Sequence, residues 1–202
     1  MHIVLIGATG RTGREVLAQA LCRSYRVTEL VRTPKAIEPC LDLTVVEGSA
    51  LNDGTIAAAL GDTDVVISAL GHRSRRESTM LRDAASAMLR ALSEQTTRPY
   101  IVVSQGLLFT SRSPVVSLMR ALLAPIVADS TAMERVVQSS NLEWTIARPP
   151  RLTPSAPRGY RATRNELPKG AWSLAFADLA AFLLDAAESG AYRRSVVGLA
   201  HA

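Results

Sequence analysis

The stretch HIVLIGATGRTGREVL, residues 2–17, joins a short apolar run to a glycine-rich turn and then to a helical pattern. The run from His2 to Ile6 has the length and composition of a buried strand at the centre of a parallel sheet. A helix is predicted to begin near Thr12, because apolar residues recur at helical spacing after it. A glycine motif between a buried strand and a helix start is the context that indicates dinucleotide binding.

Strands and helices continue to alternate beyond this first unit. Further strands are predicted at 26–31, 43–47, 64–70, 100–103 and 143–147, and helices from residue 52, at 77–95, within 113–140 and at 178–188. This order predicts an α/β protein with a Rossmann fold, in which a doubly wound, mainly parallel sheet carries helices on both faces. The ligand is then expected at the carboxyl ends of the strands. A last strand, 194–199, is expected at an edge of the sheet.

The composition is that of one globular domain. The chain has 202 residues, of which 48% are hydrophobic and 20% charged. A single NAD(P)-binding domain over residues 1–202 is therefore expected, with 151–202 contributing the cover on the substrate side. Because no apolar run approaches the roughly 20 residues that cross a bilayer, we expect a soluble, cytoplasmic protein without membrane contacts. The sequence leaves open whether it is a monomer or a homodimer.

The charge and the cysteines argue against two other classes of function. The formal net charge of +5 is carried almost wholly by arginine. Its densest cluster, residues 72–76, is too short for a nucleic-acid-binding tail and has no interleaved aromatics, so a solvated loop is favoured and nucleic acid is not an expected partner. Cys22 and Cys40 lack CxxC spacing and a nearby histidine, so neither a metal site nor a redox pair is expected.

The glycines of the turn GATGRTG, residues 7–13, have separate predicted tasks. Gly7 permits the tight turn, Gly10 lets backbone amides approach a pyrophosphate, and Gly13 lets the helix pack closely on the sheet. The start of the helix then faces the phosphates. Additional donors are available from Thr9, Arg11 and Thr12. The alternative interpretation is a glycine turn that binds no phosphate.

The end of the second predicted strand indicates which dinucleotide is bound. An acidic residue at this position holds an unmodified ribose, but here the residue is Arg32. A guanidinium forms paired hydrogen bonds with a 2′-phosphate and offers ribose hydroxyls no acceptor, so NADPH (NADP⁺) is favoured. Glu29 lies three residues earlier, inside the strand, where its side chain is expected to point away from the ribose. The alternative is that Arg32 is an ordinary surface arginine.

Several segments together resemble a known family. They are the GxxGxxG turn, LVRTP at 30–34, Ser104 after the fifth predicted strand, and ARPPRLT at 147–153. The chain resembles the atypical short-chain dehydrogenases/reductases, within them the small NAD(P)H-binding branch of biliverdin-IXβ/flavin reductases and NmrA-like proteins. The resemblance implies cofactor contacts by Gly7, Thr9, Gly10, Arg11, Thr12, Gly13, Arg32, Ala69, Leu70 and Gly71. It also implies that Ser104, Pro149, Pro150 and Arg151 lie near the nicotinamide.

The chain departs from that family pattern at two places. Ser49 stands where this branch often has an acidic residue after the third strand. The YxxxK pair of conventional short-chain dehydrogenases is absent, because the residues four positions after the four tyrosines are glutamate, serine, arginine and valine. A carbonyl reductase normally needs that tyrosine as an acid, so ordinary alcohol dehydrogenation is disfavoured. Loss of catalysis altogether is the alternative.

Few polar groups remain as catalytic candidates. Ser104 is expected to orient the substrate or the nicotinamide, with a turn-capping serine as an equally weighted alternative. Arg151 could pair with an acidic substrate. His72 could donate a proton, although a solvated loop histidine is favoured. The apolar residues 107–109 could approach a planar acceptor, and the segments 115–123 and 151–170 are expected to shape its pocket.

These observations favour an NADPH-dependent reductase that passes hydride to a planar conjugated small molecule such as a flavin, a quinone or a tetrapyrrole. The cofactor then carries the chemistry and the protein supplies position. A non-catalytic, NmrA-like sensor of NADP(H) is one alternative, and a pathway-specific ketoreductase or isomerase is another. The sequence does not identify the acceptor.

Overall fold

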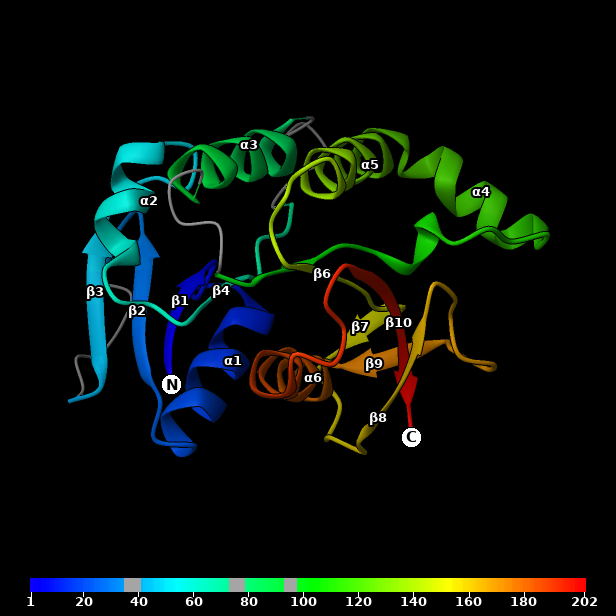
Figure 1. The fold of residues 1–202 in the computed structure, drawn as a ribbon. Coiled ribbons are helices and arrows are strands. Elements are labelled where there is room, and N and C mark those ends of the chain that lie inside the picture. The colour runs from blue at the N-terminus through cyan, green and yellow to red at the C-terminus, as the bar shows by residue number, and fades with distance from the viewer. Residues whose placement is uncertain (35–40, 73–78, 93–97) are drawn as a thin grey trace.

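A central sheet of eight strands runs through the molecule in the order β3-β2-β1-β4-β5-β6-β10-β8 (Figure 1). The computed structural model describes residues 1–34, 41–72, 79–92 and 98–202. The strands of this sheet are β1 (His2–Ile6), β2 (Arg26–Val31), β3 (Leu43–Glu47), β4 (Val65–Ser68), β5 (Tyr100–Val103), β6 (Trp144–Arg148), β8 (Tyr160–Arg164) and β10 (Ser195–His201). Every neighbouring pair is parallel except β10 with β8. The predicted Rossmann fold is therefore confirmed.

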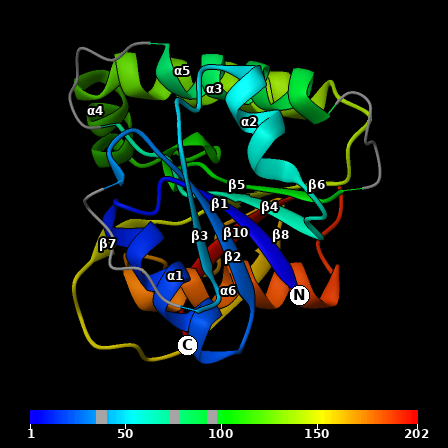
Figure 2. The same ribbon diagram turned by 90° about the vertical axis from the view of Figure 1, so that its left-hand side faces the viewer.

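Helices cover both faces of the sheet, which gives three layers (Figures 1 and 2). One face packs against α1 (Arg11–Cys22) and α6 (Phe176–Ser189), and the other against α2 (Asp53–Leu60), α3 (Met80–Leu92) and α5 (Ala124–Gln138). Alternate residues of β1 enter the two cores, since Ile3 packs toward α1 and α6 and Val4 toward the other helices. A strand buried on both faces is mostly apolar, which explains the continuous apolar run at residues 3–6.

Local signals set the helix boundaries. The side chain of Asn52 accepts the backbone N–H of Thr55 at 3.0 Å and caps α2 at the residue from which this helix was predicted. Of the helix predicted at 77–95, α3 accounts for Met80–Leu92, while 77, 78 and 93–95 lie outside the described residues. The helical region 113–140 divides into α4 (Pro114–Leu122) and α5.

Within the described ranges no single helix is long and apolar enough to cross a membrane, and α4 with α5 meets those criteria only as a pair bent by 90°.

The C-terminal region differs from the prediction in one respect that changes the sheet. The last strand, β10, is not at an edge: it lies between β6 and β8. Its outer neighbour β8 comes from the stretch 151–170, where no strand was predicted. β8 carries two exposed arginines, Arg161 and Arg164, among partly buried residues; charged side chains are common on edge strands, and that composition resembles a loop. A second, two-stranded sheet pairs β7 (Arg151–Thr153) with β9 (Ser173–Ala175).

Candidate functional site

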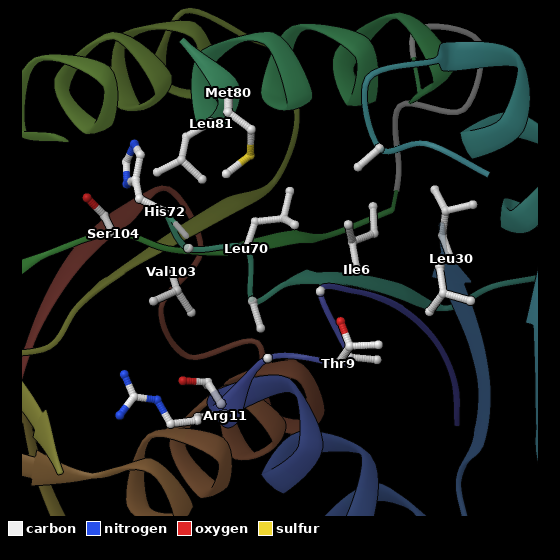
Figure 3. A pocket seen from close by; sticks show the side chains of 18 of the residues that line it. Ile6, Thr9, Arg11, Leu30, Leu70, His72, Met80, Leu81, Val103 and Ser104 are labelled. Atoms are coloured by element: carbon white, nitrogen blue, oxygen red, sulfur yellow. The ribbon is translucent and has the colours of Figure 1, made fainter. Parts of the chain in front are cut away.

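A pocket of about 580 Å³ opens at the carboxyl ends of β1, β2, β4 and β5. A ligand site is expected at this edge of a doubly wound sheet, and the volume is in the range of small-molecule sites. Figure 3 shows the pocket, with Leu30 at one end and His72 and Ser104 at the other. The lining residues are 6–12, 30–32, 48–51, 69–72, 80, 81, 103–105, 126, 130, 152 and 176.

The glycine turn at the middle of the pocket has no room for side chains at two positions. Gly7 has a φ of +88°, and a Cβ there would lie 2.9 Å from the carbonyl carbon of Ala69. A Cβ on Gly13 would lie 2.1 Å from the carbonyl oxygen of Gly7, so the start of α1 packs directly against the turn. Gly10 is different, because its hypothetical Cβ meets only the Gly7 oxygen, at 3.1 Å. The space beside Gly10 therefore belongs to the pocket.

The N-terminus of α1 offers donors to an anion. Its N-cap residue, Gly10, makes no side-chain cap, and the first turn has no acidic residue. The first N–H groups of a helix have no partners within the helix and carry a partial positive charge, so they suit a phosphate. Thr9, Arg11 and Thr12 line the pocket here. The Arg11 guanidinium lies 4.7 Å from the centre of the Phe176 ring, which holds this cation at the pocket wall. The site therefore fits a dinucleotide diphosphate.

One end of the pocket fits the adenosine half of such a ligand. It is formed by the ends of β2 and β3 and includes Arg32 and Ser49. Arg32 is exposed, so its guanidinium is accessible to a ligand. Glu29, by contrast, is fully buried and does not line the pocket. The only charged side chain at this end of the described pocket wall is therefore the arginine.

Ser104 lies at the opposite end, and its hydroxyl hydrogen is engaged. The hydroxyl donates to Oε1 of Glu134 at 2.5 Å. Glu134 is buried and also accepts two hydrogen bonds from Arg148, at 2.9 Å from Nε and 2.5 Å from Nη2. The Arg148 guanidinium in turn lies 4.6 Å from the centre of the Phe109 ring. Ser104 therefore presents oxygen lone pairs to the pocket and has no proton free to donate.

His72 corrects another expectation. A solvated position was favoured for it, but its side chain is only 7% exposed and its Nε2 lies 2.7 Å from Oδ2 of Asp129. The interpretation failed because Asp129 is 57 residues away in the sequence, on α5, and only the tertiary fold brings it to the end of β4. The rest of the arginine cluster, 73–76, lies outside the described residues.

Some predicted site residues do not line this pocket. Pro149, Pro150 and Arg151 are outside its wall, as are residues 107–109 and 115–123. Arg151 begins β7, where its backbone pairs with Ser173 and its side chain is exposed. Of the stretch 151–170, only Leu152 reaches the pocket. The prediction that this turn borders the nicotinamide therefore receives no support from the pocket wall.

Other residues reach the pocket that the sequence did not indicate. Met80 lines the pocket from the start of α3 together with Leu81. Ile126 and Ser130 come from α5, and Gln105 donates to the Ser130 hydroxyl at 2.8 Å. Only Gln105, adjacent to Ser104, was within reach of a sequence argument, because the others depend on how the helices cover the sheet.

In the described ranges, 1–34, 41–72, 79–92 and 98–202, the side chains that could bind a metal are dispersed. Within these ranges no three histidine, cysteine, aspartate or glutamate side chains form a potential metal site. Cys22 is exposed and free. Cys40 lies outside the described residues.

Comparisons with known proteins agree with this site. The model of a family described as NAD(P)H-binding matches residues 7–189. The uncharacterized protein YwnB of Bacillus subtilis (strain 168) is 26% identical over 201 residues, which cover 93% of this chain and 92% of YwnB. Photosystem II assembly factor Ycf39 of Synechocystis sp. is 25% identical over 151 residues, 72% of this chain and 43% of that protein.

Solved structures share the fold over nearly the whole chain. A Streptococcus pneumoniae protein assigned as an NADH-flavin reductase has a TM-score of 0.82 at 20% identity, covering 100% of both chains. A short-chain dehydrogenase/reductase from Veillonella parvula in complex with NADP has a TM-score of 0.79 at 22% identity, covering 99% of this chain and 94% of that one. At these identities the similarity establishes the Rossmann architecture.

Proposed function

Because the chain belongs to the NAD(P)H-binding family, we propose that it is an NADPH-dependent reductase that transfers hydride to a planar conjugated acceptor. The observation that carries this proposal is the continuity of the pocket. It runs from Arg32, past the donors of α1, to a mixed apolar and polar end formed by α3, β5 and α5. Such a pocket has room for a reactant beside the reactive end of a dinucleotide.

The cofactor is assigned to residues whose placement suits each of its parts. The α1 N-terminus with Thr9, Arg11 and Thr12 would hold the diphosphate, while Gly7, Gly10 and Gly13 keep the turn close to it. Arg32 would hold the 2′-phosphate, and Ala69, Leu70 and Gly71 would border the ribose next to the nicotinamide. Ser104 would accept a hydrogen bond from the ligand, because its own hydrogen goes to Glu134. When bound, NADPH supplies a hydride and its two electrons.

The reactant end of the pocket favours a flat, largely apolar acceptor. Met80, Leu81 and Ile126 provide apolar surface, and Gln105 and Ser130 add polar groups beside it. Neither tyrosine nor lysine is among the described pocket residues, so the tyrosine–lysine pair of conventional alcohol dehydrogenases is missing from this wall. Positioning of the two reactants therefore supplies much of the rate.

Turnover of a panel of acceptors tests this function. Purified protein is mixed with NADPH and with FMN, quinones, a linear tetrapyrrole or simple ketones, and oxidation of NADPH is followed at 340 nm, the usual absorbance band of the reduced nicotinamide. A reductase should oxidise NADPH well above the protein-free rate with at least one planar acceptor. Tight NADPH binding without turnover of any acceptor would instead support the sensor function. A cytoplasmic location and a monomeric or dimeric state remain predictions.

Replacing Arg32 with alanine is expected to remove most of the preference for NADPH over NADH. A charge-assisted hydrogen bond contributes about 1.5 to 3 kcal/mol, which corresponds to roughly ten- to hundredfold in affinity. The dissociation constants of both cofactors are measured by titration calorimetry. Arg135→Ala, at an exposed position of α5 outside the pocket, removes the same charge and serves as the control. Equal affinities of the unmodified protein for the two cofactors would contradict the assignment.

A further inference from the structure

His72 and Asp129 form a buried pair at the reactant end of the pocket. His72 follows β4, and its Nε2 lies 2.7 Å from Oδ2 of Asp129 on α5. The two side chains are 7% and 0% exposed. Figure 3 shows the imidazole beside Leu81, at the same end of the pocket as Ser104. A titratable ring therefore lies at the wall where the acceptor is expected.

The Asp129 carboxylate is fixed by the start of α3. Its Oδ2 accepts the backbone N–H of Leu81 at 2.9 Å, and its Oδ1 accepts that of Arg82 at 3.0 Å. These are first-turn N–H groups, which have no partners within the helix and stabilise negative charge. Since the carboxylate acts as an acceptor for both of them, the histidine nitrogen that faces it must be the donor. Asp129 thus holds the imidazole in the tautomer with hydrogen on Nε2.

The second ring nitrogen of His72, Nδ1, makes no hydrogen bond with any residue that the structure describes. With Nε2 committed to Asp129, Nδ1 is a bare acceptor in the neutral ring and carries a hydrogen in the protonated ring. The neighbouring Ser104 cannot take this role, because its one hydrogen is donated to Glu134. His72 is therefore the described side chain at this end that is equipped to deliver a proton.

We propose that His72 is the proton donor of the reduction and that Asp129 is its positioning residue; this assignment rests on the proposed reductase function. The acceptor takes up hydride at one atom of its conjugated system, and the displaced electron pair moves to its oxygen. That oxygen then takes the proton from Nδ1 of the imidazolium. The neutral imidazole regains a proton from water. The balance is NADPH, acceptor and one proton to NADP⁺ and reduced acceptor.

The His72–Asp129 pair also indicates which of the planar acceptors the pocket favours. Hydride addition to a quinone or a conjugated carbonyl leaves an oxyanion that must be protonated, so a proton donor in the wall is useful for this class. The apolar surface of Met80 and Leu81 beside His72 suits the ring system of such a molecule. The geometry thus favours a quinone or a conjugated carbonyl compound among the planar acceptors.

Kinetics of His72→Gln with 2-methyl-1,4-naphthoquinone as the probe test the assignment. General acids contribute about a hundredfold or more, so kcat should fall about a hundredfold while the Kd for NADPH stays within about twofold. Asp129→Asn should also lower kcat, because the ring loses its orienting acceptor. In His72→Ala, added imidazole should restore part of the rate. His201→Gln changes a histidine at the end of β10, outside the pocket, and should turn over at the unmodified rate.

A measurement without turnover examines the tautomer directly. In protein labelled with ¹⁵N-histidine, the neutral ring of His72 should show hydrogen on Nε2 and a bare Nδ1, and His72→Gln identifies its signals by their loss. Asp129→Asn should abolish this tautomer preference. A neutral ring with hydrogen on Nδ1, or a folded His72→Gln variant with unchanged kcat, would overturn the assignment and leave the reductase function standing. Failure of the unmodified protein to reduce any acceptor would overturn the reductase function and the proton-donor role together.

Discussion

Gly10→Val is expected to weaken NADPH binding by about a hundredfold or more while the protein remains folded. The backbone of Gly10 has a φ of −75°, which any L-residue can adopt. A Cβ at this position meets one atom, the Gly7 oxygen at 3.1 Å, and otherwise extends into the pocket. The branched side chain of valine would then occupy the space next to the α1 donors, where a diphosphate has to approach the backbone.

Titration calorimetry with NADPH measures this loss, and circular dichroism with thermal unfolding verifies the fold. A hundredfold weaker Kd corresponds to about 2.7 kcal/mol, which is the scale of one or two lost hydrogen bonds to a charged group. Gly10→Ala adds only the Cβ and should lose less affinity than valine. Ala18→Val adds valine to an exposed position of α1 away from the pocket and should bind normally. Near-normal affinity in folded Gly10→Val would mean that the phosphates bind elsewhere.

The fold was largely predictable because local patterns of apolar residues indicate most of its strands and helices. The apolar run at 2–6 and most of the later strand runs mark strands buried on both faces, and the helices between them repeat at the expected spacing. β8 was not predicted because it lies at the edge of the sheet and carries arginines exposed to water. A stretch of that composition resembles a loop. The position of β10 follows from its pairing with β8, and a strand that is not recognised cannot supply that pairing.

The residues of the candidate site likewise fall into those that local sequence patterns predict and those that depend on the tertiary fold. The glycine turn and Arg32 were predictable because a strand end, a turn and a helix start are contiguous in the sequence. Met80, Ile126 and Ser130 reach the pocket from α3 and α5, for which the sequence predicted helices but no contacts of these residues with a ligand. The partners of His72 and Ser104 are 57 and 30 residues away in the sequence. Contacts of this kind depend on how α5 lies across the sheet, which no local pattern specifies.

Glu29 is expected to make the protein less stable as the pH rises from about 4.5 to 7. It is 0% exposed, and neither carboxyl oxygen has a hydrogen-bond partner among the described residues. It lies on β2 opposite Leu5, whose side chain belongs to the core under α1 and α6. Burial without a partner disfavours the charged form and raises the pKa of Glu29 from its ordinary value of 4.5 to about 7. An ionised Glu29 is therefore costly in the folded protein.

The sign of the effect follows from proton linkage, and Glu29→Gln measures it. Below pH 4.5 the carboxyl is protonated in both the folded and the unfolded protein, so the substitution should change the unfolding free energy little. Between pH 4.5 and 7 only the unfolded chain ionises readily, and folding loses stability steadily as the pH rises. Above pH 7 the penalty is complete, at about 3 kcal/mol, so Glu29→Gln should be more stable than the unmodified protein by about that amount. Urea unfolding at pH 4, 6 and 8 gives the comparison, with Glu47→Gln at an exposed position of β3 as the control. A stability difference that is the same at all three pH values would show that folding does not raise the pKa of Glu29, which would contradict the prediction.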